Sequence, residues 1–242
     1  MAAPRTRDAL AVMVCYETRE RTAEALTRFP AERGYDVLLV DDGSSDGTAD
    51  VLARSGLPFV RHDRNRGLGA AIKTGIAHAL REGYEAVVIL AGNGKDDPAE
   101  IPRLLEALAA GRDYVQGSRF LPGGSHHNLP RGRHVMIRMH CRLMRWLTGF
   151  PATDAINGFR AYRLALFRDP RIDVWHPRLD RYEFESYLHY KVLTLGYRVG
   201  EVSVSKTYPR PGRGIRYSHI RPVTDWWRIL RPLLLLRLGL WR

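Results

Sequence analysis

Two adjacent carboxylates, Asp41 and Asp42, come directly after the apolar run 37–40, Val-Leu-Leu-Val. Such a run, ended at once by charged residues, predicts a buried parallel strand that leads into a ligand-facing loop. In open α/β sheets, ligands bind at the carboxyl ends of the strands. Ser45 or Asp46 can cap a helix that begins near Thr48, but capping gives no reason for Asp41 and Asp42 to stand together. We therefore expect this pair to face a ligand.

Glycines and cations gather at the start of another expected helix. Segment 65–75 reads Asn-Arg-Gly-Leu-Gly-Ala-Ala-Ile-Lys-Thr-Gly. The free backbone N–H groups at a helix start favour a bound anion. Arg66 and Lys73 are therefore candidates for phosphate contacts. The alternative is a solvated loop in which Asn65 caps the helix.

The elements that must position these residues alternate between short apolar runs and helical patterns. The expected strands are 9–15, 37–40, 58–60, 86–90 and 114–116, and the expected helices are 21–33, 48–54, 67–81 and 99–110. This alternation predicts an α/β fold with a largely parallel sheet covered by helices on both faces. No GxGxxG motif follows the first strand, which argues against a dinucleotide-binding domain.

Charge is distributed unevenly along the 242 residues, which carry a net charge of +12. Residues 1–120 hold 16 Lys and Arg against 18 Asp and Glu, whereas residues 121–242 hold 22 against 8. The basic half would attract phosphates on nucleic acid, on an anionic membrane or on a lipid-phosphate acceptor. A nucleic-acid-binding protein would account for the charge but not for Asp41 and Asp42, so we expect no nucleic-acid partner.

The two cysteines, Cys15 and Cys141, stand far apart in apolar surroundings. This usage suits reduced thiols in a cytoplasmic protein. Residues 1–8 are polar, and the apolar run that follows is too brief for a secretory signal. We expect a cytoplasmic location, at the inner face of the cell membrane if the tail described below binds lipid.

Several motifs together resemble the inverting glycosyltransferases of family two, in particular the dolichol-phosphate and polyprenyl-phosphate mannosyltransferases. They are the Val37–Thr48 stretch, Gly117-Ser118-Arg119-Phe120, the Asp154–Arg160 segment of the form Asp-x-x-x-Gly-Phe-Arg, and the run Tyr197–Ser203 with Glu201. The resemblance spans about residues 9–222. It implies the nucleotide-sugar-binding glycosyltransferase A-type fold, with a mostly parallel central sheet flanked by helices. It also implies transfer from a nucleoside diphosphate sugar, such as GDP-mannose or a UDP-hexose.

The resemblance implies a set of donor-binding residues. Asp42 would bind the base, and Asp41 or Asp46 would shape the ribose site. The family's first strand usually ends in Pro-x-Tyr-Asn-Glu, and here only Tyr16 matches. The donor-binding candidates are Tyr16, Asp41, Asp42, Asp46, Arg66, Lys73 and Asn93.

The resemblance also implies a divalent cation held by Asp-x-Asp after the fourth strand, and here the pattern departs. The two aspartate positions fall on Ala91 and Asn93, and the next polar position falls on Lys95. An alanine cannot ligate and a lysine repels a divalent ion. We expect Lys95, with Arg119, to neutralise the leaving diphosphate instead. Two alternatives stay open: Mg²⁺ or Mn²⁺ held from a shifted position by Asp96 and Asp97, or a non-catalytic nucleotide-binding protein.

The acceptor determines the remaining chemistry. A polyprenyl phosphate is already an anionic nucleophile and needs arginines, for which Arg119, Arg131, Arg133, Arg210 and Arg213 are candidates. A soluble hydroxyl acceptor in polysaccharide or natural-product assembly needs a carboxylate base. Asp154 is the first candidate for that base, with Glu183 and Glu185 behind it. The alternative for Asp154 is a salt bridge to Arg160.

The end of the chain differs in character from the rest. Residues 1–221 are expected to form the catalytic domain, and residues 222–242 an amphipathic tail in which arginines interrupt leucines and tryptophans. The arginines leave no uninterrupted run of the roughly 20 apolar residues needed to cross a bilayer. We expect peripheral contact with a membrane or, alternatively, contact in a homo-oligomer.

Overall fold

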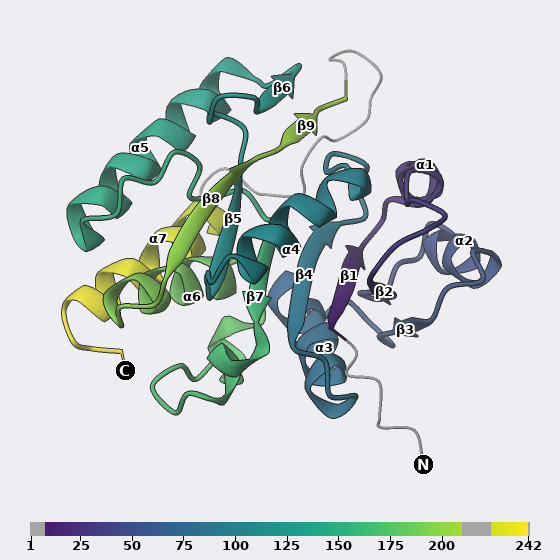
Figure 1. Cartoon of the computed structure of the whole chain (residues 1–242), viewed down its shortest axis with the longest axis horizontal. Coiled ribbons are helices and arrows are strands. Elements are labelled where there is room, and N and C mark those ends of the chain that lie inside the picture. The colour runs from purple at the N-terminus through teal and green to yellow at the C-terminus, as the bar shows by residue number, and fades with distance from the viewer. Residues whose placement is uncertain (1–7, 210–223, 242) are drawn as a thin grey trace.

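A seven-stranded sheet forms the centre of the computed structural model, which describes residues 8–209 and 224–241 (Figure 1). The strand order is β3-β2-β1-β4-β7-β5-β8, and only β7 runs antiparallel to its neighbours in this sheet. The expected mostly parallel sheet is therefore confirmed. The strands are β1 Ala9–Cys15, β2 Asp36–Asp41, β3 Phe59–Arg61, β4 Ala86–Ala91, β5 Tyr114–Ser118, β7 Arg160–Arg163 and β8 Val199–Ser203. A separate parallel pair joins β6 Ser125–His127 to β9 Ser205–Thr207.

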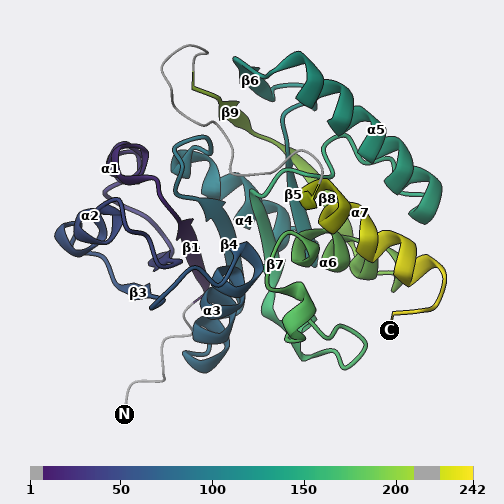
Figure 2. The ribbon, with the colours of Figure 1, turned by 180° about the vertical axis from the view of Figure 1, so that it is seen from behind.

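Helices cover both faces of the sheet. They are α1 Arg19–Thr27, α2 Thr48–Arg54, α3 Leu68–Arg81, α4 Ile101–Ala109, α5 Arg131–Thr148, α6 Glu183–Thr194 and α7 Thr224–Arg237, with short 3₁₀ turns at Pro98–Glu100, Leu164–Arg168 and Pro177–Leu179. Seen from behind, α3, α6 and α7 lie on one face (Figure 2). The expected helix 21–33 is observed as Arg19–Thr27. It ends before the predicted end because Pro30 disfavours helical backbone at the residue before it.

The alternation of side chains along β1 divides the core between the two faces. Leu10, Val12 and Val14 belong to one buried cluster with residues of α3 and α6. Ala11 and Met13 belong to a second cluster with residues of α1, α2 and α4. Because both faces are covered, every side chain of β1 is buried. This explains why the strand reads as a continuous apolar run.

Helix α5 packs its apolar stripe on α6 and α7 through a third cluster that includes Ile137, Met144 and Leu233. His140, on the same stripe, is 3% exposed. Its Nδ1 has no hydrogen-bond partner among the described residues. Burial, and secondarily the charge of Arg160, lowers the pKa of His140 from 6.5 to about 4. The imidazole is therefore held neutral in the folded protein.

His140 should make the folded protein sensitive to acid. Since its pKa is lower in the folded state, the unfolded chain binds more protons between about pH 6.5 and pH 4, and stability falls as the pH drops through that window. The loss attributable to His140 approaches about 3 kcal/mol at the acid end. Urea unfolding of His140→Gln across this range should show a shallower dependence on pH than the wild type. His127→Gln, at an exposed position, is the control, and an unchanged slope in His140→Gln would contradict the assignment.

Candidate active site

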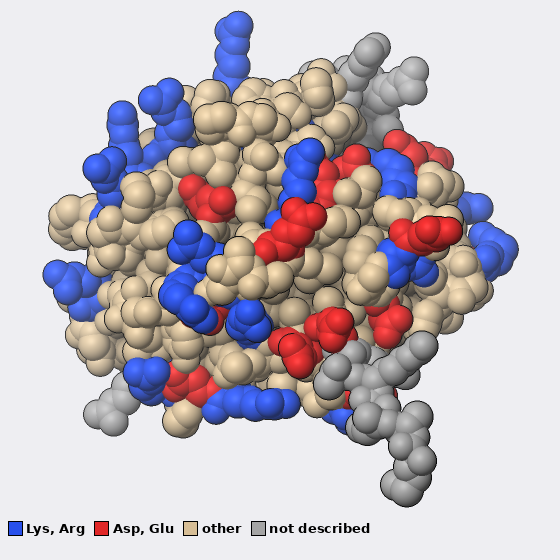
Figure 3. Space-filling model, viewed as in Figure 1, with Lys and Arg blue, Asp and Glu red and all other residues tan. Residues whose placement is uncertain are grey.

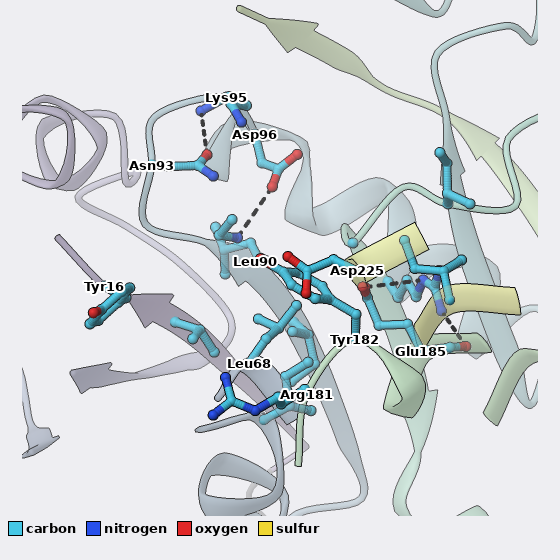
Figure 4. Close-up of a pocket in the computed structure, with 18 of the residues that line it drawn as sticks. Tyr16, Leu68, Leu90, Asn93, Lys95, Asp96, Arg181, Tyr182, Glu185 and Asp225 are labelled. Atoms are coloured by element: carbon cyan, nitrogen blue, oxygen red, sulfur yellow. Dashed lines mark hydrogen bonds and ion pairs between the residues drawn. The ribbon is translucent and has the colours of Figure 1, made fainter. Parts of the chain in front are cut away.

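A cavity of about 600 Å³ opens at the carboxyl ends of β1, β2 and β4 and is closed on the other side by α6 and α7. Figure 4 shows Asn93, Lys95 and Asp96 on the loop after β4, facing a wall that carries Arg181, Tyr182, Glu185 and Asp225. Among the described residues, eight Lys and Arg but only four Asp and Glu line it. The cations are Arg21, Lys95, Arg119, Arg133, Arg160, Arg181, Lys206 and Arg228. The cavity therefore suits a multiply charged anion.

Asp42 lies in the wall of this cavity and organises the loop before α3. Its Oδ1 lies 2.8 Å from Nδ1 of His62 and accepts from the backbone N–H of Arg66 at 2.9 Å. Its Oδ2 accepts from Nδ2 of Asn65 at 2.9 Å and from the backbone N–H of Gly67 at 2.8 Å. These bonds connect the end of β2 to the start of α3. A ligand in this corner meets a carboxylate whose position is already fixed by the protein.

The glycines at the start of α3 allow a close approach of the segment before α6. A Cβ on Gly69 would lie 2.0 Å from the carbonyl oxygen of Leu179. Lys73 donates to Asp180 at 2.7 Å. Lys73 and Arg66 line a second cavity, of about 310 Å³, and not the main one. The structure thus places these two donor-binding candidates apart from Tyr16, Asp42 and Asn93, which do line the main cavity.

Asp41 and Asp46 hold backbone in place behind the cavity. Asp41 is fully buried, accepts from the backbone N–H of Ser44 at 3.2 Å and pairs with Arg61. Asp46 accepts from the backbone N–H of Thr48 at the start of α2. The N-cap residue of α2 is Gly47, so the expected capping by Asp46 is corrected: Asp46 lies one position earlier and accepts from Thr48.

Asp154 and Arg119 form a buried ion pair beside the cavity. Nε and Nη2 of Arg119 each lie 2.6 Å from an oxygen of Asp154, and both side chains are at most 1% exposed. The remaining Nη1 donates to the hydroxyl of Tyr208. The sequence suggested a salt bridge from Asp154 to Arg160, and this is wrong, because Asp154 pairs with Arg119. Arg160 donates instead to the carbonyl oxygens of residues 155, 157 and 185. Arg119 lines the cavity, whereas Asp154 lies behind it.

The loop after β4 brings Lys95 into the cavity at 6% exposure. Its Nζ lies 5.5 Å from the centre of the Tyr208 ring. Burial, together with the charges of Lys206 and Arg133, lowers the pKa of Lys95 well below its ordinary value. Asp96 accepts from the backbone N–H of Ala91 at 3.2 Å and from Nζ of Lys206 at 2.6 Å.

These residues do not fit the divalent metal that the sequence resemblance implies. Asp97 accepts from the backbone N–H of Ala99 and caps the 3₁₀ turn, and Asp96 is already paired with Lys206. Within residues 8–209 and 224–241, no group of three or more His, Cys, Asp or Glu could hold a metal ion. A divalent cation would also meet strong repulsion from Lys95, Lys206 and Arg133.

The structure adds residues that the sequence did not point to. Lys206 comes from β9, within a polar Ser-Lys-Thr strand that matches no motif. Helix α7 packs on α6 and contributes Asp225, Trp226 and Arg228 to the cavity wall. The tail thus contributes to the site, although only its apolar and basic composition was visible in the sequence.

The remaining acceptor-phosphate candidates lie in different places. Arg133 lines the cavity. Arg131 stands at the exposed start of α5 and is not part of the cavity wall. Arg210 and Arg213 lie outside the described residues.

Comparison with known proteins gives consistent matches. The family model described as "Glycosyl transferase family 2" matches residues 11–169. A polyprenol monophosphomannose synthase from Mycolicibacterium smegmatis is 36% identical over 177 residues, which cover 71% of this chain and 66% of that protein. An undecaprenyl-phosphate mannosyltransferase from Micrococcus luteus is 33% identical over 220 residues, which cover 85% of this chain and 88% of that protein.

Solved structures of low sequence identity share the fold. Mannosyl-3-phosphoglycerate synthase from Rubrobacter xylanophilus superposes with a TM-score of 0.68 at 17% identity, covering 97% of this chain and 76% of that chain. Glucosyl-3-phosphoglycerate synthase from Mycobacterium tuberculosis, in complex with Mn²⁺, UDP and glucosyl-3-phosphoglycerate, superposes with a TM-score of 0.65 at 18% identity, covering 96% and 80%. The expected glycosyltransferase A-type fold is confirmed.

Asp154→Asn should destabilise the protein markedly. The substitution leaves the buried guanidinium of Arg119 without its counter-charge, and breaking a buried pair in this way costs about 3 to 5 kcal/mol. Urea unfolding at pH 7 measures the loss. Glu82→Gln, which removes an exposed pair with Arg81, is the matched control and should change stability by less than about 1 kcal/mol. Equal losses of stability in the two variants would show that the buried Asp154–Arg119 pair stabilises the fold no more than an exposed pair does.

Proposed function

Because the chain belongs to glycosyl transferase family 2 and is a glycosyltransferase, we propose that it transfers a sugar from a nucleoside diphosphate to a polyprenyl phosphate, with inversion at the anomeric carbon. The observation that carries the proposal is the cationic cavity at the carboxyl ends of the parallel strands. A diphosphate and an acceptor phosphate together bring several negative charges into one site. The excess of lining arginines and lysines matches that demand.

The donor would lie across the carboxyl ends of β1, β2 and β4. Tyr16 and Asp42 form the corner for the nucleoside, and Asn93 continues that wall toward the loop after β4. Lys95, with Arg119 beside it, would face the diphosphate. Charge that develops on the departing group is then met by cations already fixed in place, which lowers the barrier most effectively in a site that excludes water.

The acceptor assignment rests on which groups are free to take a proton. A phosphate nucleophile needs none removed, whereas a hydroxyl acceptor needs a base. Both oxygens of Asp154 accept from Arg119, so the carboxylate favoured by the sequence is already engaged. Arg133 lines the same cavity and supplies a contact for an acceptor phosphate. This arrangement favours the polyprenyl phosphate.

One observation favours a second candidate, transfer to a soluble hydroxyl acceptor. Glu185 lines the cavity, and its ion-pair partner, Arg160, lies 3.9 Å away. This carboxylate is less firmly engaged than Asp154 and could serve as the base. Glucosyl-3-phosphoglycerate synthase, whose fold this chain shares, is described in complex with a phosphorylated small-molecule product.

The lipid acceptor requires contact with a membrane, and α5 offers a surface for it. Val135, Met139 and Trp146 are exposed on this helix, Trp146 at 76%. The same helix carries exposed arginines at positions 131, 138, 142 and 145, and Figure 3 shows blue side chains projecting at the upper left, over α5. Exposed Trp227, Leu238 and Leu240 extend the apolar character to the C-terminal segment. No helix in the described parts of the chain is long and apolar enough to cross a bilayer, so the proposal is peripheral binding.

Donor binding and acceptor choice can be measured together. Calorimetric titration of GDP-mannose and of UDP-glucose should give binding for one of them in excess chelator. Lys95→Ala should weaken that binding about tenfold or more, since a hydrogen bond to a charged group contributes about 1.5–3 kcal/mol. Arg54→Ala, at an exposed position on α2, is the control. With that donor, mass spectrometry should detect transfer to undecaprenyl phosphate. Transfer confined to 3-phosphoglycerate, and lost in Glu185→Gln, would replace the lipid acceptor with the soluble one.

Membrane contact predicts a specific loss of vesicle binding. The double variant Trp146→Ser/Arg142→Glu should sediment at least about tenfold less with phosphatidylglycerol vesicles, because each basic residue near an anionic surface contributes about 1 kcal/mol. Phe59→Ser/Arg54→Glu, which changes an exposed aromatic residue and an arginine on β3 and α2, is the matched control. Equal sedimentation of both variants would contradict this surface. Absence of vesicle binding together with a mass that rises with concentration in light scattering would favour the homo-oligomer instead.

A further inference from the structure

Lys206 is buried in the cavity wall and is held by two oxygens. Its Nζ donates to Oδ1 of Asp96 and to Oδ1 of Asn157, both at 2.6 Å. The residue is 8% exposed and lines the main cavity. An ammonium has three N–H donors, and two of them are directed by these acceptors. The side chain therefore holds its charge at a defined point.

The acceptors of Lys206 are themselves fixed by the backbone. Asp96 accepts from the N–H of Ala91 at the end of β4, and Nδ2 of Asn157 donates to the carbonyl oxygen of Gly117 at 3.0 Å. Strand β9, which carries Lys206, is attached to the loop after β4 because the N–H of residue 207 donates to the carbonyl oxygen of Lys95 at 3.1 Å. Three separate parts of the chain thus converge on one ammonium.

Positive charge around Lys206 exceeds the negative charge that neutralises it. Lys95 and Arg133 line the same cavity, and both lie near the ring of Tyr208. Among the described salt bridges, Lys206 pairs with the carboxylate of Asp96, which leaves the charges of Lys95 and Arg133 to be neutralised. Buried charge without a counter-charge is costly. An anionic ligand would supply the missing counter-charge.

Asp96 and Asn157 also present the ligand types that a divalent ion prefers. Carboxylate and amide oxygens bind Mg²⁺ and Mn²⁺, and Asp96 stands in the loop after β4, the segment where the resemblance placed the metal. The Lys206 ammonium lies between these two oxygens. The same two groups that could have held a metal hold an organic cation instead.

We propose that the Lys206 ammonium, held between Asp96 and Asn157, takes the place of the divalent ion and binds the departing diphosphate. The inference rests on the proposed transfer reaction. An oxygen of the acceptor phosphate forms a bond to the anomeric carbon, the bond from that carbon to the diphosphate breaks, and its electron pair stays on the diphosphate oxygen. No proton is taken up, and the charge gained by the leaving group is met by Lys206, with Lys95 beside it. Asp96 and Asn157 are positioning residues.

The decisive experiment converts the lysine site into a metal site. Wild-type protein should turn over equally in excess chelator and in Mn²⁺, and electron paramagnetic resonance with added UDP or GDP should detect no tightly bound Mn²⁺. Lys206→Ala should lower kcat in chelator by about a hundredfold. Since the substitution frees Asp96 and Asn157, this variant should also bind Mn²⁺ and recover part of kcat with it. Lys206→Ala/Asp96→Asn should abolish the Mn²⁺ signal.

Controls separate the outcomes. Lys206→Arg keeps a cation and should lose less kcat than Lys206→Ala, and Lys206→Met serves if the alanine variant fails to fold. Any of three results would overturn the proposal. The first is a wild type that requires Mn²⁺ for activity, the second is full activity of Lys206→Ala in chelator, and the third is a Lys206→Ala protein that folds and yet binds no Mn²⁺. Absence of transfer by the wild type with every donor would instead refute the proposed function. The resonance measurement would still report whether Asp96 and Asn157 can exchange an ammonium for a metal.

Discussion

Buried positive charge is the constraint on which the rest of the site depends. Lys95, Lys206 and Arg119 are each less than 10% exposed, yet all three line one cavity. Keeping several cations out of water requires that each be held by oxygen atoms or by an anion. Arg119 is satisfied by Asp154 and Lys206 by Asp96. Burial and, after it, the like charges of Lys206 and Arg133 lower the pKa of Lys95, so the cavity suits a ligand that brings negative charge.

The fold meets this constraint by bringing distant segments to one edge of the sheet. The parallel strands β1, β2 and β4 deliver the loops that carry Tyr16, Asp42 and Asn93. The antiparallel strand β7 enters between β4 and β5, and the segment before it supplies both Asp154 and Asn157. Without that insertion, the partners of Arg119 and Lys206 would not face them. Helix α7 then closes the cavity from the far side.

The sequence predicted the elements whose signal is local. The first strand and the helix over Thr48–Arg54 were predicted with their observed bounds, because continuous apolar runs and capping residues act over a few positions. Strand β7 was not predicted, since Arg-Ala-Tyr-Arg has neither an apolar run nor a clear alternation. Its place in the sheet comes from pairing with β4 and β5, which no local pattern encodes.

Several residues of the cavity wall were predicted from the sequence, but the pairings of the buried side chains were not. The sequence shows Ala91 and Asn93 at the two positions where the resemblance implies metal ligands. The partner of Asp154 is 35 residues away, at Arg119, whereas the sequence suggested the nearby Arg160. Lys206 is 110 residues from Asp96, and a lone lysine in a polar strand carries no signal of such a contact. Contacts between residues so far apart in the sequence depend on how the strands pack in the sheet.

A lysine and a divalent ion meet the same electrostatic demand with different consequences. A metal can leave with the diphosphate product, and its occupancy depends on its concentration. An ammonium on β9 remains in the protein after each turnover, so the site keeps its positive charge when the product leaves. Because Lys206 also contacts Asp96 and Asn157, it joins β9, the loop after β4 and the segment before β7. The charge that would stabilise the leaving group is thereby part of the packing that holds the cavity together.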